Sequence, residues 1–295
     1  MNSINFMAQA KGALRVRRIE TQNELREAHP DQATVGFVPT MGFLHDGHAS
    51  LIKRARAENE TVIVSIFVNP LQFAPNEDFE RYPRDMERDL ALCESLGVDQ
   101  VFTPSVSEMY GRQPVLTSVH VRELGNHLCG ASRKGHFDGV CTVVSKLFHL
   151  VQPTHAYFGK KDAQQWRILK RMVADLSMAV DIVPCEIVRE SDGLALSSRN
   201  VYLSEEERAR APQFNQTLRE LRDALRPGES VAERLAKGCA KLEESGFRID
   251  YLNVYDDETL APLLHAPEQT PCLIAGAIYL GKTRLIDNLE WRASF

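Results

Sequence analysis

Residues 37–48 read Phe37-Val38-Pro39-Thr40-Met41-Gly42-Phe43-Leu44-His45-Asp46-Gly47-His48. Residues 34–38 have the β-branched and aromatic content of a short buried strand, and Leu51, Ile52 and Ala55 further on repeat at helical spacing. The stretch therefore predicts a strand, a tight turn and a helix. The N-terminus of such a helix carries unsatisfied N–H groups and a partial positive charge, which together favour a bound phosphate.

His45 and His48 are spaced so that both can lie on one face of this helix. If the helix begins near His45, a separation of three residues puts both imidazoles beside its N-terminus. An isolated pair of this kind is more often two solvated histidines on a surface turn. Here the preceding strand, Pro39 and the glycines Gly42 and Gly47 favour a phosphate-binding turn instead. The element resembles the His-x-Gly-His signature of nucleotidylyl transferases and class I aminoacyl-tRNA synthetases.

The composition is typical of a soluble globular protein that acts on a small molecule. The chain has 295 residues, 43% of them hydrophobic, which is enough for two domains. Its net charge of −5 comes from interspersed acidic and basic residues, so we expect neither nucleic acid nor a membrane as a partner. The six cysteines lie far apart, which predicts reduced, mostly buried thiols and no metal site. No signal peptide or long apolar run is apparent, so the predicted location is the cytoplasm.

Strands and helices are predicted to alternate through the first two thirds of the chain. Predicted strands cover residues 61–68, 98–102, 115–121, 155–159 and 180–188, and predicted helices cover 86–96, 140–151 and a segment from 160 onward. The near-continuous apolar run at 61–68 is typical of a strand buried on both faces of a parallel sheet. The fold class is therefore predicted to be α/β, with a Rossmann-like doubly wound parallel sheet.

Beyond residue 190 the pattern changes to helices followed by strands. Capping boxes at Ser204-x-x-Glu207 and Ser230-x-x-Glu233 open two predicted helices, and residues 248–255, 272–278 and 283–286 are predicted strands with a hairpin turn at Gly281-Lys282. We therefore predict a Rossmann-like domain at 1–189 and a smaller C-terminal α+β domain at 190–295, which would act as a lid.

Polar residues follow several of the predicted strands, at the edge of the sheet where ligands bind. Gln72 offers an amide that suits a hydroxyl or carboxylate, and Lys161 offers a mobile charge for phosphates. Ser197, Ser198 and Arg199 combine hydroxyls with a guanidinium, a set that can clamp a phosphate. Taken singly, Gln72 and the serine-arginine set are each more often a solvated turn, a linker or a cap.

Taken together, five motifs resemble the pantoate-β-alanine ligase family over nearly the whole chain. They are Val38-Pro39-Thr40-Met41-Gly42 with His45-x-Gly47-His48, Phe67-Val68-Asn69-Pro70 with Gln72-Phe73, Gly135-His136-Phe137-x-Gly139-Val140, Phe158-Gly159-x-Lys161-Asp162 with Gln164-Gln165, and Asp192-Gly193-Leu194-Ala195-x-Ser197-Ser198-Arg199-Asn200. The resemblance implies an ATP-dependent ligase that condenses pantoate with β-alanine to pantothenate. A pantoyl-adenylate would form with release of pyrophosphate, and the amine of β-alanine would then displace AMP.

The resemblance also implies roles for individual residues. The implied ATP-binding residues are Met41, Gly42, Phe43, Leu44, His45, Asp46, Gly47, His48, Gly159, Lys160, Lys161, Asp162, Val188, Leu196, Ser197, Ser198 and Arg199. The implied catalytic residues are His48, His45, Lys161 and Arg199, with His48 the candidate proton donor. Gln72 and Gln165 would bind pantoate, Gln72 would also lie near β-alanine, and Arg133 and His136 would lie close to the acceptor pocket.

The resemblance implies variation within the family at three motif positions, Phe43, Asp138 and Lys160. Of these, Lys160 adds a second cation beside Lys161, and the pattern favours Lys161 as the phosphate ligand. The resemblance further implies Mg²⁺ together with ATP, and a homodimer.

Two alternative functions stay open from the residues themselves. Attack on an α-phosphorus requires charge neutralisation and in-line positioning, which His45, His48, Lys161 and Arg199 could supply. Another His-x-Gly-His nucleotidylyl transferase, acting on a different small acceptor, would need only the first and third motifs, and the pair Gln72 and Gln165 argues against it. A non-catalytic nucleotide-binding regulator could also retain the fold.

Overall fold

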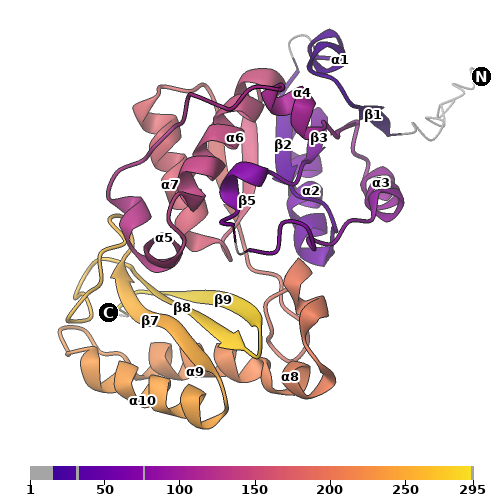
Figure 1. Ribbon diagram of the computed structural model, residues 1–295. Helices are drawn as coiled ribbons and strands as arrows, with labels where there is room; N and C mark the ends of the chain where they lie inside the picture. The colour runs from indigo at the N-terminus through magenta and orange to yellow at the C-terminus, as the bar shows by residue number, and fades with distance from the viewer. Residues whose placement is uncertain (1–15, 31–32, 76, 294–295) are drawn as a thin grey trace, which may run out of the picture.

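The computed structural model describes residues 16–30, 33–75 and 77–293 of the chain. Within these ranges, six parallel strands form one sheet in the order β1-β4-β3-β2-β5-β6. Figure 1 labels β1, β2, β3 and β5 of this sheet. Its strands are β1 (Arg17–Ile19), β2 (Val35–Thr40), β3 (Thr61–Ile66), β4 (Gln100–Phe102), β5 (His155–Gly159) and β6 (Asp181–Cys185). The helices around it are α1 (Gln22–Glu27), α2 (Asp46–Glu58), α3 (Met86–Ser95), α4 (Val106–Tyr110), α5 (Leu128–Ser132), α6 (His136–Val151) and α7 (Ala163–Asp175).

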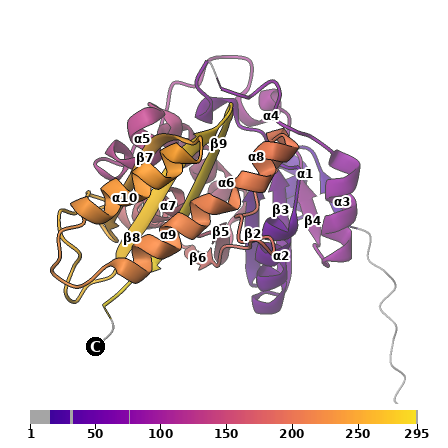
Figure 2. The ribbon, with the colours of Figure 1, turned by 90° about the horizontal axis from the view of Figure 1, so that it is seen from below.

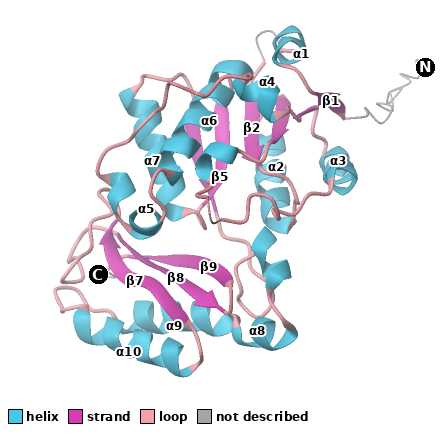
Figure 3. Cartoon of the chain, viewed as in Figure 1, coloured by secondary structure: helices cyan, strands magenta, loops and turns pink. Residues whose placement is uncertain are grey.

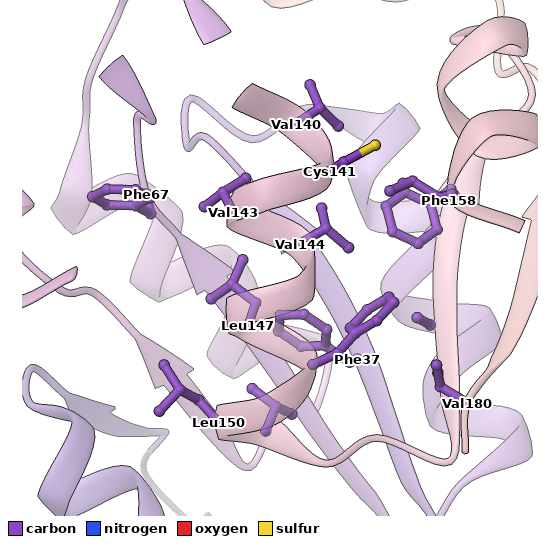
Figure 4. Close-up of a cluster of buried hydrophobic side chains, with 14 of the residues drawn as sticks. Phe37, Phe67, Val140, Cys141, Val143, Val144, Leu147, Leu150, Phe158 and Val180 are labelled. Carbon is purple, nitrogen blue, oxygen red and sulfur yellow. The ribbon is translucent and has the colours of Figure 1, made fainter. Parts of the chain in front are cut away.

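Helices cover both faces of this sheet. Successive residues of a strand are therefore buried on opposite sides. Phe37 of β2 belongs to a core cluster with residues of α6 and α7, whereas the next residue, Val38, packs in a second cluster with α2. Figure 4 shows Val144 and Leu147 projecting from α6 beside Phe37. The predicted doubly wound parallel sheet is confirmed.

The chain reverses its direction of travel across the sheet at β2. It passes from β2 to β3 and β4 on one side, and later returns to the other side of β2 as β5. Strands β2 and β5 pair only through Gly36 with His155 and Phe37 with Ala156, before their carboxyl ends. Such a switch point leaves a crevice outside the sheet. The loops that follow β2 and β5 therefore meet at this crevice.

A smaller α+β unit follows. Strands β7 (Arg248–Asp256), β8 (Cys272–Leu280) and β9 (Thr283–Trp291) form an antiparallel sheet, accompanied by α8 (Glu205–Arg210), α9 (Pro212–Ala224) and α10 (Ala232–Glu244). Helices α9 and α10 cover one face of this sheet (Figure 2), which lies between them and the larger unit (Figure 3). Its main core cluster begins at Leu194 and includes Phe214 and Ile274. The predicted α+β unit is confirmed, and a domain boundary near residue 190 stays a prediction.

The predicted strand at 115–121 is wrong. This segment is irregular, and Val119 and Val121 are partly buried against the core that contains α6. The backbone N–H of Val119 donates to the hydroxyl of Thr142 on α6 at 3.0 Å. The alternating pattern thus arises because the segment is half-buried against a helix.

The predicted capping box at Ser230-x-x-Glu233 is also wrong. Helix α10 begins at Ala232, with Val231 in the capping position and no side-chain cap. Val231 is only 3% exposed, and its N–H donates to the carbonyl of Leu264. Packing in the smaller unit therefore overrides the local capping preference. The box at Ser204 and Glu207 is confirmed.

The six cysteines are free thiols, and all except Cys239 are buried, as predicted. In the ranges that the structure describes, no helix is both long enough and apolar enough to cross a membrane.

Gly139 allows α6 to pack directly against the turn that carries Gln72. A Cβ atom added at Gly139 would lie 2.2 Å from the carbonyl oxygen of Leu71, a backbone atom that cannot easily move. We expect Gly139→Ala to lower the free energy of unfolding by roughly 1–3 kcal/mol, the usual cost of overpacking. Gly125→Ala is the matched control, because a Cβ there meets nothing within 4 Å. Equal urea midpoints for the two variants would contradict the close packing.

Candidate functional site

A tight turn follows β2 and is held from behind by Asp89 of α3. The Asp89 carboxylate, in a residue that is 1% exposed, accepts the backbone N–H groups of Phe43 and Leu44, both at 2.7 Å. Gly42 and Phe43 both have positive φ, and a Cβ at Gly42 would lie 2.9 Å from Ile66. The sequence patterns did not single out Asp89, because an aspartate within a helix carries no local sign of a distant partner.

Two histidine rings cap the start of α2, which begins at Asp46, next to the expected start near His45. His45 Nδ1 accepts the N–H of Gly47 at 3.1 Å, and His48 Nδ1 accepts the N–H of His45 at 3.3 Å. The ring centroids are 4.1 Å apart. A Cβ at Gly47 would lie 2.8 Å from the His45 ring, so the glycine lets that ring fold back over the helix start.

These caps fix the protonation state of both rings. A backbone N–H can only donate, so Nδ1 of His45 and of His48 must be the unprotonated nitrogen. Burial lowers the pKa of His45 to about 4, and the charge of Lys161 adds to this effect. Burial also lowers the pKa of His48 well below its usual range, helped by His45 and Lys161. At neutral pH each ring is therefore uncharged and carries its single N–H at Nε2.

A cavity of about 220 Å³ lies at the switch point and brings most of the predicted residues together. The predicted site residues that line it are Met41, His45, Gly47, His48, Gln72, Gly159, Lys161, Asp162, Gln165, Val188, Leu196, Ser197, Ser198 and Arg199. They come from the loops after β2, β3, β5 and β6 and from the helix starts beside them. Residues distant in the sequence thus converge where the sheet topology predicts a ligand.

The two adjacent lysines take different directions. The Lys160 ammonium is held by Glu186 at 2.6 Å and Glu290 at 3.2 Å. Lys161 lines the cavity, and its ammonium donates to the carbonyl of Leu196 at 3.3 Å. The structure therefore places Lys161 at the cavity, and a phosphate contact from Lys160 stays a prediction.

Four other predicted ATP-binding residues belong to the turn or to the helix start but do not line this cavity. Leu44 is fully buried in the core, and Asp46 is exposed at the start of α2. Gly42 and Phe43 form the left-handed part of the turn. Their contacts with a nucleotide stay predictions.

Gln72 and Gln165 line the same cavity, and Asn69 orients the first of them. Asn69 is 1% exposed, and its amide donates to Gln72 Oε1 and to the carbonyl of Gly139, both at 3.1 Å. Its own Oδ1 accepts the hydroxyl of Tyr110 at 2.7 Å. This buried network points the Gln72 Nε2 group toward Met41 Sδ, 3.3 Å away.

Arg133 and His136 line a second, larger cavity of about 850 Å³ between the two units. Arg133 pairs with Glu77 at 2.6 Å and donates to His136 Nε2 at 2.9 Å. His136 Nδ1 donates to the carbonyl of Gln72 at 2.8 Å. Burial lowers the pKa of His136 to about 4, with Arg133 adding to the effect, so the ring is neutral at pH 7. Both ring nitrogens are engaged within the protein, and a direct substrate contact stays a prediction.

Arg199 lies beside both cavities and is held by a residue that the sequence patterns did not single out. Its Nε and Nη2 groups donate to the carboxylate of Asp78 at 3.0 and 2.9 Å. Its guanidinium lies 5.9 Å from the centroid of the Tyr82 ring. Most of residues 77–85 are charged, a composition that gives no sign of which carboxylate pairs with Arg199.

Strand β9 of the smaller unit forms hydrogen bonds with the loop after β5. The Asn288 amide donates to the carbonyls of Lys160 and Lys161 at 3.0 and 2.9 Å. The neighbouring Asp287 forms a bidentate ion pair with Arg189 at 2.7 and 2.8 Å. The backbone at Lys161 is thus positioned by both units.

No group of three or more His, Cys, Asp or Glu side chains is placed to hold a metal ion among residues 16–30, 33–75 and 77–293.

The depressed histidine pKa values predict a loss of stability in mild acid. Between about pH 6.5 and about pH 4 the unfolded chain binds protons at His45 that the folded chain does not, so the free energy of unfolding falls as pH falls. His45→Asn keeps an acceptor for the cap and removes this titration. Urea unfolding near pH 7 and near pH 5 should show a smaller loss for His45→Asn than for wild type. Equal losses would contradict the neutral state of this ring.

Comparison with known proteins gives one consistent family. The model of the family described as pantoate-beta-alanine ligase matches residues 15–290. The chain is 53% identical over 281 residues to the pantothenate synthetase of Fervidobacterium nodosum, covering 93% of this chain and 99% of that protein.

Solved structures agree. A pantothenate synthetase from Thermus thermophilus is 51% identical, with a TM-score of 0.87 and coverage of 93% of this chain and 99% of that one. A pantoate-beta-alanine ligase from Francisella tularensis, complexed with beta-gamma ATP and beta-alanine, is 36% identical with a TM-score of 0.78, and the match covers 93% and 97% of the two chains.

Proposed function

The chain belongs to the pantoate-β-alanine ligase family, and on that premise we propose how its residues carry out the reaction. It is an ATP-dependent ligase that condenses pantoate with β-alanine to pantothenate through a pantoyl-adenylate, with release of pyrophosphate and AMP. The observation that carries the residue assignments is the convergence of His45, His48, Lys161 and Arg199 on one cavity at the switch point. Because the match covers nearly the whole chain, a nucleotidylyl transferase with another acceptor is set aside.

The ATP phosphates bind at the start of α2, between the two histidines and the two cations. Lys161 and Arg199 supply the positive charge that offsets the phosphates. His45 and His48 are uncharged and present Nε2–H groups, so they donate hydrogen bonds as charge develops during attack on the α-phosphorus. A proton transfer from His48 would require a further proton source, since the ring holds a single N–H at neutral pH.

The rest of the nucleotide follows the walls of the cavity. Gly159 and Asp162 lie next to Lys161 at the end of β5 and contact the ribose, while Val188 and Leu196 provide apolar contacts for adenine. The Asp162 side chain makes no capping hydrogen bond to α7, which leaves its carboxylate available for a hydroxyl.

Pantoate binds through Gln72 and Gln165, whose amides suit its hydroxyl and carboxylate groups. The carboxylate of pantoate is itself the nucleophile, so no side chain needs to form a covalent intermediate. β-Alanine enters from the larger cavity, near Gln72, Arg133 and His136.

A magnesium ion accompanies the ATP phosphates in this proposal. Mg²⁺ with a nucleotide is usually held by phosphate oxygens, water and one or two carboxylates, and Asp162 is a carboxylate that lines the cavity and could contribute. The contribution of the ion would be to neutralise phosphate charge. A homodimer and a cytoplasmic location also stay proposals, the first of which sedimentation velocity would test.

The smaller unit, residues 190–295, acts as a lid over the site. It already contacts the Lys161 loop through Asn288, and its β8–β9 hairpin lines the larger cavity. Closure would exclude water, which matters because an acyl-adenylate hydrolyses readily.

We expect His48→Ala to lower the rate of adenylate formation by roughly 10²- to 10³-fold, the usual effect of removing one preorganised donor. The measurement is pyrophosphate release with ATP and pantoate in single turnover. His149→Ala is the control, because His149 is exposed on α6. Full pyrophosphate release by His48→Ala would overturn the assignment.

Gln165→Ala should raise the KM for pantoate far more than the KM for ATP, since the lost amide binds only pantoate in this proposal. The adjacent Gln164→Ala provides a contrast. Gln164 donates to the carbonyls of Leu124 and His127 at 2.7 and 2.8 Å and is 4% exposed, so its loss should lower stability. Equal changes in both KM values for Gln165→Ala would indicate a general disruption of the cavity instead.

A further inference from the structure

Asp78 and Arg199 form an ion pair at the point where the two cavities meet. Two nearly parallel hydrogen bonds join them, from Nε to Oδ2 at 3.0 Å and from Nη2 to Oδ1 at 2.9 Å. The Asp78 side chain is 19% exposed and that of Arg199 is 31% exposed. Such a bidentate pair fixes the plane of the guanidinium as well as its position.

The pairing leaves one side of the guanidinium available. A guanidinium has five N–H groups, and Asp78 uses one on Nε and one on Nη2. Within the described part of the chain, the two Nη1 donors and the second Nη2 donor of Arg199 make no hydrogen bond. Arg199 can therefore hold Asp78 with one edge and a phosphate with another.

The segment that carries Asp78 rests on the segment that carries Arg199. The hydroxyl of Tyr202, at the end of the short helix η3 (Ser198–Tyr202), donates to the carbonyl of Arg81 at 2.9 Å. The Arg199 guanidinium also lies 5.9 Å from the centroid of the Tyr82 ring. Together with the ion pair, these contacts hold Asp78 beside Arg199.

Both members of the pair are ionised at neutral pH. Burial would raise the pKa of Asp78, but the hydrogen bonds and charge of Arg199 hold it below its usual range. The carboxylate thereby offsets the cost of partly burying the Arg199 charge.

We propose that Asp78 is a positioning residue, which holds the Arg199 guanidinium so that its Nη1 side meets the ATP phosphates during adenylate formation. The inference rests on the proposed role of Arg199 as a phosphate ligand. It adds a residue from a loop that none of the sequence motifs contains.

Asp78→Asn separates this role from a general structural one. Losing the bidentate geometry should lower kcat for adenylate formation roughly 10- to 100-fold, the scale expected when a charged group is misplaced by about 1 Å. Removing a negative charge next to the phosphates should leave the KM for ATP unchanged or lower. A collapse of the loop would instead raise the KM for ATP, and that result would overturn the proposal.

A double-mutant cycle with Arg199→Ala tests whether Asp78 acts through Arg199. If it does, Asp78→Asn should change the rate of pyrophosphate release by less than about twofold once Arg199 is absent. An undiminished effect in the Arg199→Ala background would overturn the positioning role while leaving the function of Arg199 intact. Full activity of Arg199→Ala alone would overturn both.

Two further variants serve as controls. Asp99→Asn weakens another partly exposed ion pair, in which Arg56 Nη1 lies 2.7 Å from Asp99 Oδ2, next to the amino end of β4 and away from the cavities. It should leave the kinetics unchanged, and a rate loss equal to that of Asp78→Asn would contradict the proposal. Asp78→Glu restores the charge and should recover part of the rate; no recovery would also contradict it.

Discussion

The first turn of α2 is capped by the ring nitrogens of its own histidines, and the chemistry of the site depends on that cap. Helix starts leave backbone N–H groups without partners, and here Nδ1 of His45 and of His48 accept two N–H groups at this start. The same bonds set the tautomer, so that the single N–H of each ring is at Nε2. Gly47 is required because its missing side chain makes room for the His45 ring. The two hydrogen bonds that cap the helix are therefore the same bonds that leave an N–H donor at Nε2 of each histidine.

The remaining groups reach this cap because buried polar side chains hold their loops in place. Asp89 fixes the turn after β2, Asn69 fixes Gln72, and Asn288 fixes the backbone at Lys161. Each loop is held by at least one bond to an element distant in the sequence, which for the Gln72 turn is the bond from the Asn69 amide to the carbonyl of Gly139. The switch point brings the loops together, and these bonds set their positions more finely.

The parts of the site that the sequence predicted are those encoded locally. A buried strand, a glycine turn and a helix start can be recognised within twelve residues, and the five motifs supplied most of the cavity lining. The partners Asp78, Asp89 and Asn288 could not be predicted, because a carboxylate or amide looks the same locally whatever it pairs with across the fold. The strand predicted at 115–121 is wrong for a related reason. Alternating apolar residues indicate a half-buried segment, but they do not tell whether a sheet or a helix covers its apolar side.

The protonation state of the two histidines is the central claim, and ¹⁵N NMR of the imidazole nitrogens tests it most directly. In protein labelled at histidine, we expect His45 and His48 to show an unprotonated Nδ1 and a protonated Nε2 throughout the neutral range. Assignment would come from His45→Asn and from His48→Ala. An imidazolium signal from either ring near pH 7, or protonation at Nδ1, would contradict the claim.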